Sequence, residues 1–347
     1  MAPALPLCVI GGGSIGFRHM SVALAAPQID LTAVVEPQEA RRAELESLGF
    51  PVVSGVEDVP ARTRAAVIAT PTPDHLASGL AALGRGWAVL VEKPVTATLD
   101  EAETLCRAAE SAGLPLLTGH HRRCHPFVAA ARDRLPDLGT LVAVQGLWSL
   151  RKHDSYYDVP WRRAPGAGPI LTNLSHEIDL LRLFMGEIAS ITAQTANAAR
   201  GLAIEDTAAL TLGFASGALG TFLISDAGAS PWSFEAASGE NPEIGQTGQD
   251  PVRFIGTKAS LCFPSLDLWH EATDWRTAQT RTPGPKLPRV DPILEQMLRF
   301  ARVAGGAADD LLATGRDGLA TLAATLATLD AAASGGTVHV GPVTECA

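Results

Sequence analysis

Short, almost wholly apolar runs alternate with amphipathic stretches over the first third of the chain. Such runs are typical of strands that are buried on both faces of a sheet. They predict strands at residues 6–10, 29–35, 51–53, 65–69, 87–91 and 115–118. The amphipathic stretches predict helices near residues 14–26, 37–48, 73–84 and 98–112. This alternation predicts an α/β domain over residues 1–119, with a parallel sheet covered on both faces.

From about residue 187 the pattern changes to strand-like runs separated by short gaps rich in glycine, serine and aspartate. The expected strands lie at residues 188–196, 206–214, 218–225, 233–238, 251–256, 259–264 and 265–270. Their hairpin spacing predicts a large, mainly antiparallel sheet. Few helices are left to cover that sheet, so we expect a partner subunit to cover one of its faces.

The remaining segments complete a second, α+β domain that we expect to span residues 120–347. The long polar and aromatic loop at 151–169 is a candidate lid or substrate loop, and the polar loop at 237–250 is placed near the cleft or a subunit interface. The C-terminal helix is a candidate to pack back on the first domain. The other elements expected here are helices near 124–135, 169–186, 291–304 and 315–333, and strands at 141–150 and 337–340.

A glycine pattern separates the first expected strand from the first expected helix. Gly11, Gly13 and Gly16 have the spacing G-x-G-x-x-G. In a strand, turn and helix of this kind the first glycine permits the tight turn. The second lets the backbone approach a pyrophosphate, and the third lets the helix pack on the strand. The N–H groups at the start of the helix, from Ser14 and Ile15 onward, would face the negative charge. The pattern therefore predicts a dinucleotide site.

An acidic residue ends the second expected strand. Glu36 lies twenty residues beyond Gly16, where a carboxylate accepts hydrogen bonds from ribose hydroxyls and repels a 2′-phosphate. The position favours NAD over NADP, although Arg41 and Arg42 could soften that preference. In the alternative interpretation, Glu36 only ends a strand at the surface.

Two loops follow later strands at the carboxyl edge of the expected sheet, where ligands of open parallel sheets bind. In the first, Thr70 and Pro71 begin a stiff turn that can flank a flat ring, and His75 falls in the next helical turn. In the second, Glu92 and Lys93 follow a buried strand. All five are candidate cofactor contacts. Lys93 is also a candidate donor to a substrate oxygen, the alternative being a simple pair with Glu92.

Past residue 119 the chain is dense in histidine and arginine. The histidines lack carboxylate or thiolate neighbours in ligand spacing, so no metal site is expected. This segment is a candidate hinge, with Arg122 or His121 pointing into a cleft. In the loop that follows, Trp161 and Arg162 are candidates to cover a ring and grip an oxygen, the alternative being a surface loop held by aromatics.

The helix expected over residues 169–186 carries a polar stripe. Thr172, Asn173, His176 and Asp179 recur at helical spacing, opposite an apolar face. His176 is a candidate general base, because an imidazole titrates near neutral pH. The alternative is a helix histidine satisfied by a nearby carboxylate.

Composition narrows the partners of the 347-residue chain. Its net charge of −10 argues against nucleic acid or an anionic membrane, and favours a small or weakly charged substrate. No apolar run is long enough to span a membrane, and no basic leader precedes the first strand, so neither a spanning helix nor a signal peptide is expected. The five scattered cysteines are typical of reduced thiols in a cytoplasmic protein.

Together these segments resemble the Gfo/Idh/MocA family of NAD(P)-dependent oxidoreductases. The likeness rests on GGGSIG, VVEP, the ATPTPDHL and VEKP loops, GHHRR, the WRR segment and GPILTNLSHEIDLLRLFMG. It implies a Rossmann domain followed by an open-faced sheet, and dimers or tetramers formed through that sheet. The family's lysine falls on Lys93 and its helix histidine on His176. Where polyol dehydrogenases of the family carry an aspartate, this chain has Thr172, so Asn173 is expected to orient the substrate while His176 handles the proton.

The resemblance implies an NAD-dependent dehydrogenase that oxidises a hydroxyl of a sugar, cyclitol or related small polyol. Two alternatives stay open. Some proteins on this scaffold use NAD transiently for glycoside cleavage or related lyase chemistry, and others bind NAD as regulators without turnover.

Overall fold

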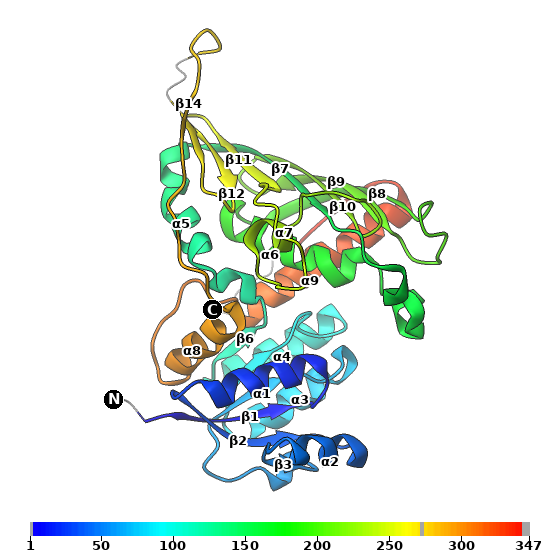
Figure 1. Cartoon of the computed structure of the whole chain (residues 1–347), viewed down its shortest axis with the longest axis vertical. Coiled ribbons are helices and arrows are strands. Elements are labelled where there is room, and N and C mark those ends of the chain that lie inside the picture. The colour runs from blue at the N-terminus through cyan, green and yellow to red at the C-terminus, as the bar shows by residue number, and fades with distance from the viewer. Residues whose placement is uncertain (1–2, 271–273, 342–347) are drawn as a thin grey trace. The chain divides into compact units, whose positions relative to one another are not determined.

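A computed structural model describes residues 3–270 and 274–341 (Figure 1). The chain forms two compact units. The first comprises residues 3–125 and 290–322, and the second comprises residues 126–289 and 323–341 with the gap at 271–273. The functional boundary expected between residues 119 and 120 stays a prediction. Residues 315–334 form one helix that begins in the first unit and ends in the second.

The first unit contains a six-stranded parallel sheet in the order β3-β2-β1-β4-β5-β6, which confirms the expected α/β fold. Its strands are β1 Leu5–Ile10, β2 Ile29–Val35, β3 Val52–Val53, β4 Ala65–Ile68, β5 Ala88–Val91 and β6 Leu116–Thr118. The helices that begin in this unit are α1 Ser14–Ala25, α2 Glu39–Ser47, α3 His75–Gly84, α4 Leu99–Ala112, α8 Pro292–Ala304 and α9 Gly315–Ser334.

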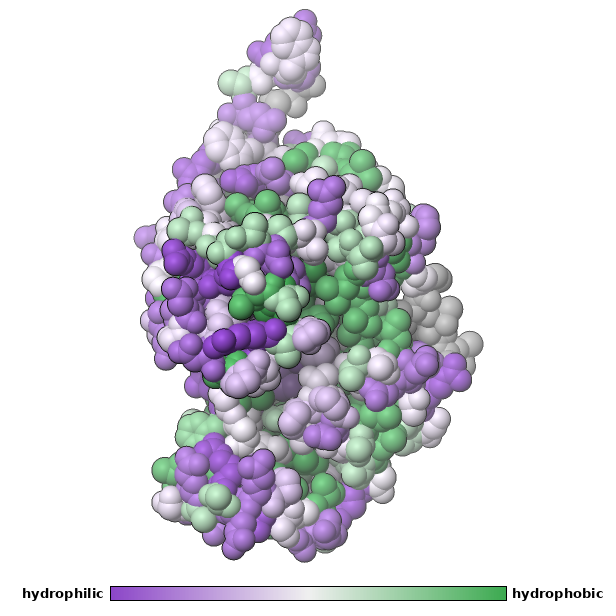
Figure 2. Space-filling view, turned by 90° about the vertical axis from the view of Figure 1, so that its right-hand side faces the viewer, coloured by the Kyte–Doolittle hydropathy of each residue, from purple (hydrophilic) through white to green (hydrophobic). Residues whose placement is uncertain are grey.

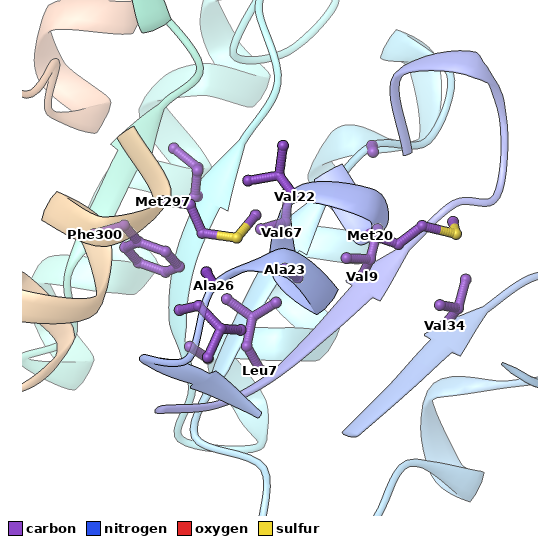
Figure 3. Packing of buried hydrophobic residues seen from close by; sticks show 14 of the residues in the cluster. Leu7, Val9, Met20, Val22, Ala23, Ala26, Val34, Val67, Met297 and Phe300 are labelled. Atoms are coloured by element: carbon purple, nitrogen blue, oxygen red, sulfur yellow. The ribbon is translucent and has the colours of Figure 1, made fainter. Parts of the chain in front are cut away.

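The core of this unit lies between the sheet and its helices. Leu7 and Val9 of β1 are fully buried, as is Met20 of α1. Met297 and Phe300 of α8 join the same cluster, although α8 is far from β1 in the sequence (Figure 3). Asp291 caps α8 by accepting hydrogen bonds from two backbone N–H groups of its first turn. The late helix therefore completes the core around the glycine turn.

The second unit contains a nine-stranded mixed sheet in the order β14-β13-β12-β11-β7-β10-β9-β8-β15. The β10 and β7 strands are parallel and the other pairs are antiparallel, as the hairpin spacing predicted. The strands are β7 Leu141–Ser149, β8 Ile188–Ala196, β9 Thr207–Phe214, β10 Leu219–Ser225, β11 Val252–Gly256, β12 Ser260–Phe263, β13 Leu268–His270, β14 Thr280–Thr282 and β15 Thr337–His339.

One expected strand is wrong. Residues 233–238 form the short helix α7, Phe234–Ser238, in place of a strand. The Ser233 hydroxyl accepts a hydrogen bond from the N–H of Ala236 and so caps the helix. The apolar positions of so short a segment fit both the helical and the strand period, and the serine cap favours the helix.

Short helices cover one face of this large sheet. They are α5 Pro126–Arg134, α6 Ser175–Met185 and α7. Phe127 of α5 and Phe184 of α6 pack against Phe263 of β12, with ring centroids 5.6 and 5.4 Å apart. Buried residues alternate with more exposed ones along most of β9 and β10, which is why one face forms a core.

The outward face keeps apolar side chains exposed. Leu219 and Leu223 of β10 and Ile255 of β11 are all among the exposed large hydrophobic residues. The space-filling view in Figure 2 shows one side of the molecule, on which apolar atoms gather in patches between polar ones. No helix of the described residues is both long enough and apolar enough to cross a membrane.

Candidate active site

The turn between β1 and α1 is built by close approach of backbone atoms. Gly11 has φ +105°, and a Cβ there would lie 2.6 Å from the Ala69 carbonyl oxygen. A Cβ on Gly16 would lie 1.9 Å from the carbonyl oxygen of Gly11. An added Cβ on Gly13, in contrast, meets no atom within 4 Å. Gly11 and Gly16 are therefore required by the protein itself, whereas Gly13 borders open space.

The start of α1 suits an anion. Gly13 occupies the N-cap position without a side-chain cap, and the first turn, which includes Ser14 and Ile15, holds no acidic residue. Backbone N–H groups at a helix start have no partner within the helix. A phosphate bound beside Gly13 could accept their hydrogen bonds and gain from the helix dipole.

Glu36 follows β2 and is buried beside the same turn. Its Oε2 accepts a hydrogen bond from the N–H of Gly12 at 3.0 Å, and its Oε1 accepts one from the N–H of Gln38 at 2.9 Å. Arg41 and Arg42 donate to backbone carbonyls around this turn. The carboxylate is thus fixed at the strand end, and each oxygen retains a second lone pair for a ribose hydroxyl.

The loop after β4 is tied to the loop after β5 by one imidazole. His75 is buried, and its ring nitrogens lie 3.0 Å from the carbonyl oxygen of Thr70 and 2.9 Å from that of Pro94. The hydroxyl of Thr70 is buried without a hydrogen-bond partner among the described residues. His75 therefore holds the turn at Pro71 in place, and direct contact of these residues with a cofactor stays a prediction.

A buried carboxylate anchors the candidate lysine. Glu92 follows β5, and its Oε1 lies 2.7 Å from Nε2 of His19 on α1, a residue whose role the sequence did not reveal. Glu92 Oε2 accepts a hydrogen bond from the backbone N–H of Lys93 at 3.1 Å. Burial would raise the pKa of Glu92, but the hydrogen bond from His19 and the charges of His19, His121 and Lys93 outweigh it and lower the pKa to about 2. An ionised carboxylate therefore joins the glycine helix to the backbone of half-buried Lys93.

The basic segment after β6 is largely buried. His121 and Arg122 lie in a 3₁₀ turn, His121–Cys124, in which the arginine side chain is buried. They belong to the first unit. Among the described residues no group of three or more histidine, cysteine, aspartate or glutamate side chains is placed to hold a metal ion.

The polar stripe of the second unit lies on two kinds of helix. Residues Ile170–Leu174 form a π-helical turn, which includes Thr172 and Asn173, and α6 follows with His176 and Asp179. His176 and Asp179 are both buried. The periodicity predicted one continuous α-helix, but the π turn adds a residue ahead of the histidine, a feature often found at functional sites.

The candidate substrate loop at 151–169 folds against itself. Trp161 is 58% exposed. The Arg162 guanidinium lies 4.1 Å from the ring centroid of Tyr156 and donates to the Tyr156 carbonyl oxygen at 3.0 Å. Arg162 therefore stabilises the loop, and any grip on a ligand would have to use its remaining donors.

The same loop contributes a residue that the sequence did not single out. Lys152 donates to Asn173 Oδ1 at 2.9 Å and lies 3.4 Å from Asp226 Oδ2. The two partners are distant from it in the sequence, so no local spacing reveals the cluster.

A glycine turn at the carboxyl edge of a parallel sheet, followed in the chain by a second unit with a buried histidine and a half-buried amide, is typical of a two-domain dinucleotide-binding protein. Comparison with known proteins is consistent with this class. Residues 6–120 match "Oxidoreductase family, NAD-binding Rossmann fold", and residues 131–262 match "GFO/IDH/MocA C-terminal domain". The chain belongs to the Gfo/Idh/MocA family.

Two individual relatives match only about half of this chain, at 28% and 32% identity. A D-xylose 1-dehydrogenase (NADP(+)) of Haloferax volcanii is 28% identical over 192 residues, or 54% of this chain and 59% of the relative. Myo-inositol dehydrogenase Hyg17 of Streptomyces leeuwenhoekii is 32% identical over 197 residues, which are 55% of this chain and 59% of the relative. The chain thus spans about three-fifths of the length of these relatives.

A solved structure of levoglucosan dehydrogenase in complex with NADH is similar in fold. Its TM-score is 0.78 at 19% identity, and the match covers 97% of this chain and 99% of that one.

Proposed function

We propose that this chain is an NAD-dependent dehydrogenase that oxidises a hydroxyl of a sugar, cyclitol or related small polyol. NAD, when bound, supplies the hydride acceptor. His176 takes the hydroxyl proton, while the Lys93 ammonium stabilises the oxygen as it becomes a carbonyl. The substrate carbon thus loses one hydride and its oxygen loses one proton.

The anchored lysine carries the proposal. The ionised Glu92 joins His19 of the glycine helix to the backbone of Lys93, so the lysine follows the strand end at which ligands of such sheets bind. The two relatives described above are named as dehydrogenases of a sugar and of inositol, which favours a polyol substrate. In the second unit, Asn173, Thr172 and Asp179 are proposed to bind substrate hydroxyls, together with Arg122 and Trp161.

Glu36 supports the preference for NAD. A 2′-phosphate would meet a buried carboxylate fixed by two backbone N–H groups. The relative from Haloferax is named as NADP-dependent and the levoglucosan dehydrogenase structure contains NADH, so the coenzyme is a property to measure on this chain.

A screen of sugars, sugar acids and cyclitols with NAD and with NADP tests the proposal, with absorbance of the reduced cofactor as readout. We expect turnover of at least one polyol, with higher kcat/KM for NAD. A glycoside cleaved without accumulation of NADH would favour transient use of the cofactor. Tight NAD binding without turnover across the panel would favour a regulator.

The exposed face of the nine-stranded sheet is the proposed contact between two copies of the chain. Apolar Leu219, Leu223 and Ile255 alternate with buried neighbours, and the described helices that pack on the sheet lie on its other face. Leu223→Asp should convert the assembly to monomers in light scattering. The matched change Leu48→Asp, at an exposed leucine after α2, should leave the assembly intact.

A cytoplasmic location completes the proposal. Cys8, Cys106, Cys124 and Cys262 are free thiols, and the first three are buried. Burial raises the pKa of each of those three to about 12, so they stay protonated and unreactive. Cys346 lies outside the described residues. Such thiols are typical of a reducing compartment.

A further inference from the structure

A lysine side chain is largely buried in the second unit, where an ammonium is costly without partners. The side chain of Lys152 is 13% exposed and that of Asp226 is 1% exposed. Lys152 Nζ lies 3.4 Å from Asp226 Oδ2 and donates a hydrogen bond to Asn173 Oδ1 at 2.9 Å. The ammonium therefore pairs with the Asp226 carboxylate and with the amide next to Thr172, and it also lies 4.8 Å from the centroid of the Tyr156 ring.

A network fixes the ammonium in this position. The Tyr157 hydroxyl donates to Asp226 Oδ2, and Arg200 Nε lies 3.4 Å from Asp226 Oδ1. Arg200 also donates to the backbone carbonyl of Lys152 at 2.9 Å, and the N–H of Lys152 donates to the Asp226 carbonyl at 2.9 Å. Burial lowers the pKa of Lys152, Asp226 raises it and Arg200 lowers it further. Both the backbone and the side chain of Lys152 are held from several sides.

The ammonium determines which way the Asn173 amide faces. An ammonium has donors and no acceptor, so the amide oxygen must face Lys152. The Thr172 hydroxyl lies 2.9 Å from the same oxygen, but its single hydrogen is shared with the Gly168 carbonyl oxygen, also at 2.9 Å, so Lys152 is the partner that fixes the amide. A flipped amide would set its NH₂ group against the ammonium of Lys152, which cannot accept a hydrogen bond. Nδ2 of Asn173 therefore points away from Lys152, and it has no hydrogen-bond partner among the described residues.

We propose that Lys152 is a positioning residue that locks Asn173 as a hydrogen-bond donor toward the substrate. This inference rests on the proposed function and defines its substrate more narrowly. The substrate must place an acceptor oxygen, from a hydroxyl, ring ether or carboxylate, at Asn173 Nδ2. A protonated amine at that place has only donors, so amino-substituted analogues of a good substrate are rejected.

Asn173→Asp gives the sharpest test. The carboxylate still accepts from Lys152, so the local fold is retained, but the donor to the substrate is replaced by an acceptor. We expect kcat/KM for the best polyol of the screen to fall about 10-fold or more, mainly through KM. Activity on the matching amino sugar should rise relative to its parent. If the Lys152 contact only supports the loop, Asn173→Asp would be as active as the wild-type enzyme, and the proposal would be overturned.

A double-mutant cycle tests the coupling. Lys152→Met and Asn173→Ala should each lower kcat/KM about 10-fold with the NAD dissociation constant unchanged, and the double variant should be no worse than either within about 2-fold. Independent, additive losses would sink the idea. Lys286→Met, at an exposed lysine of the same unit, is the matched control.

A thermal-unfolding cycle separates this inference from the proposed function. Asn173→Asp should raise the unfolding temperature with Lys152 present and lose that gain with Lys152→Met, whether or not any polyol turns over. Absence of turnover in the wild-type chain would refute the proposed dehydrogenase activity, and with it the proposed selection of substrates by Asn173. Absence of the thermal coupling would refute the locked amide.

Discussion

The two halves of the proposed site are built from different materials. In the first unit the nucleotide turn consists of backbone atoms, and Gly11 and Gly16 permit contacts that a Cβ would block. In the second unit the proposed substrate group, Asn173, belongs to a cluster of side chains from three distant segments, formed by Lys152, Asn173 and Asp226. A site made of backbone leaves a short spacing in the sequence. A site made of distant side chains leaves none.

Lys93 is the main exception in the first unit, because its proposed contribution comes from a side chain. Lys93→Met should lower kcat at least about 100-fold, since the ammonium that stabilises the developing carbonyl oxygen is lost. The NAD dissociation constant, measured by quenching of intrinsic fluorescence, should change little.

Lys258→Met, at an exposed lysine, is the matched control. Turnover near the wild-type level in Lys93→Met would remove Lys93 from the mechanism. Loss of NAD binding would instead assign it to the cofactor.

Gly13→Ala tests whether a glycine at this position is needed for cofactor binding or for folding. A Cβ there meets no atom within 4 Å and the backbone angles of −68° and −169° suit alanine, so the fold should be retained. We expect the NAD dissociation constant to rise about 10-fold or more, because the methyl group lies where a pyrophosphate must approach.

Gly84→Ala also adds a methyl group into open space and should leave NAD binding unchanged. Gly16→Ala should lower the unfolding temperature, because its Cβ would collide with the Gly11 carbonyl. Equal NAD affinity in Gly13→Ala and Gly84→Ala would mean that no pyrophosphate passes Gly13.

This contrast explains how much of the molecule could be predicted from the sequence. Buried parallel strands produce unbroken apolar runs, so the first sheet was predicted within two residues at each strand end. The strand predicted at 233–238 was wrong because a segment of so few residues is compatible with both the helical and the strand period. The π turn at Ile170–Leu174 was missed because it barely changes the spacing of the apolar residues.

From spacing alone, functional residues could be predicted only where they lie close together in the sequence. The glycines and Glu36 lie within one strand-helix-strand unit, so their spacing indicated a dinucleotide. His19 was missed because its partner, Glu92, lies four strands later in the chain, so the two residues meet only in the folded protein. Lys152 was missed for the same reason, since a polar loop gives no sign of a buried ammonium.

Glu36→Ser sharpens the nucleotide half of the comparison. Removal of the buried carboxylate eliminates its repulsion of a 2′-phosphate and leaves Arg41 and Arg42 nearby. The ratio of kcat/KM for NAD over NADP should fall about 10-fold. Glu39→Ser, on the exposed first turn of α2, is the matched control and should leave that ratio unchanged. An unaltered ratio in Glu36→Ser would show that coenzyme choice lies elsewhere.

Glu92→Gln tests a buried charge in the first unit. The folded-state pKa of Glu92 is lowered from 4.5 to about 2, so its ionised form stabilises the fold above about pH 4.5, and that stability is lost as pH falls toward 2. The amide should lower the free energy of unfolding at pH 7 by about 1–3 kcal/mol, because charge-assisted hydrogen bonds to His19 and Lys93 become neutral ones. Urea unfolding between pH 2.5 and 7 measures both effects. The variant should lose less stability than the wild-type chain on acidification, and parallel curves would mean that His19 is held without the charge of Glu92.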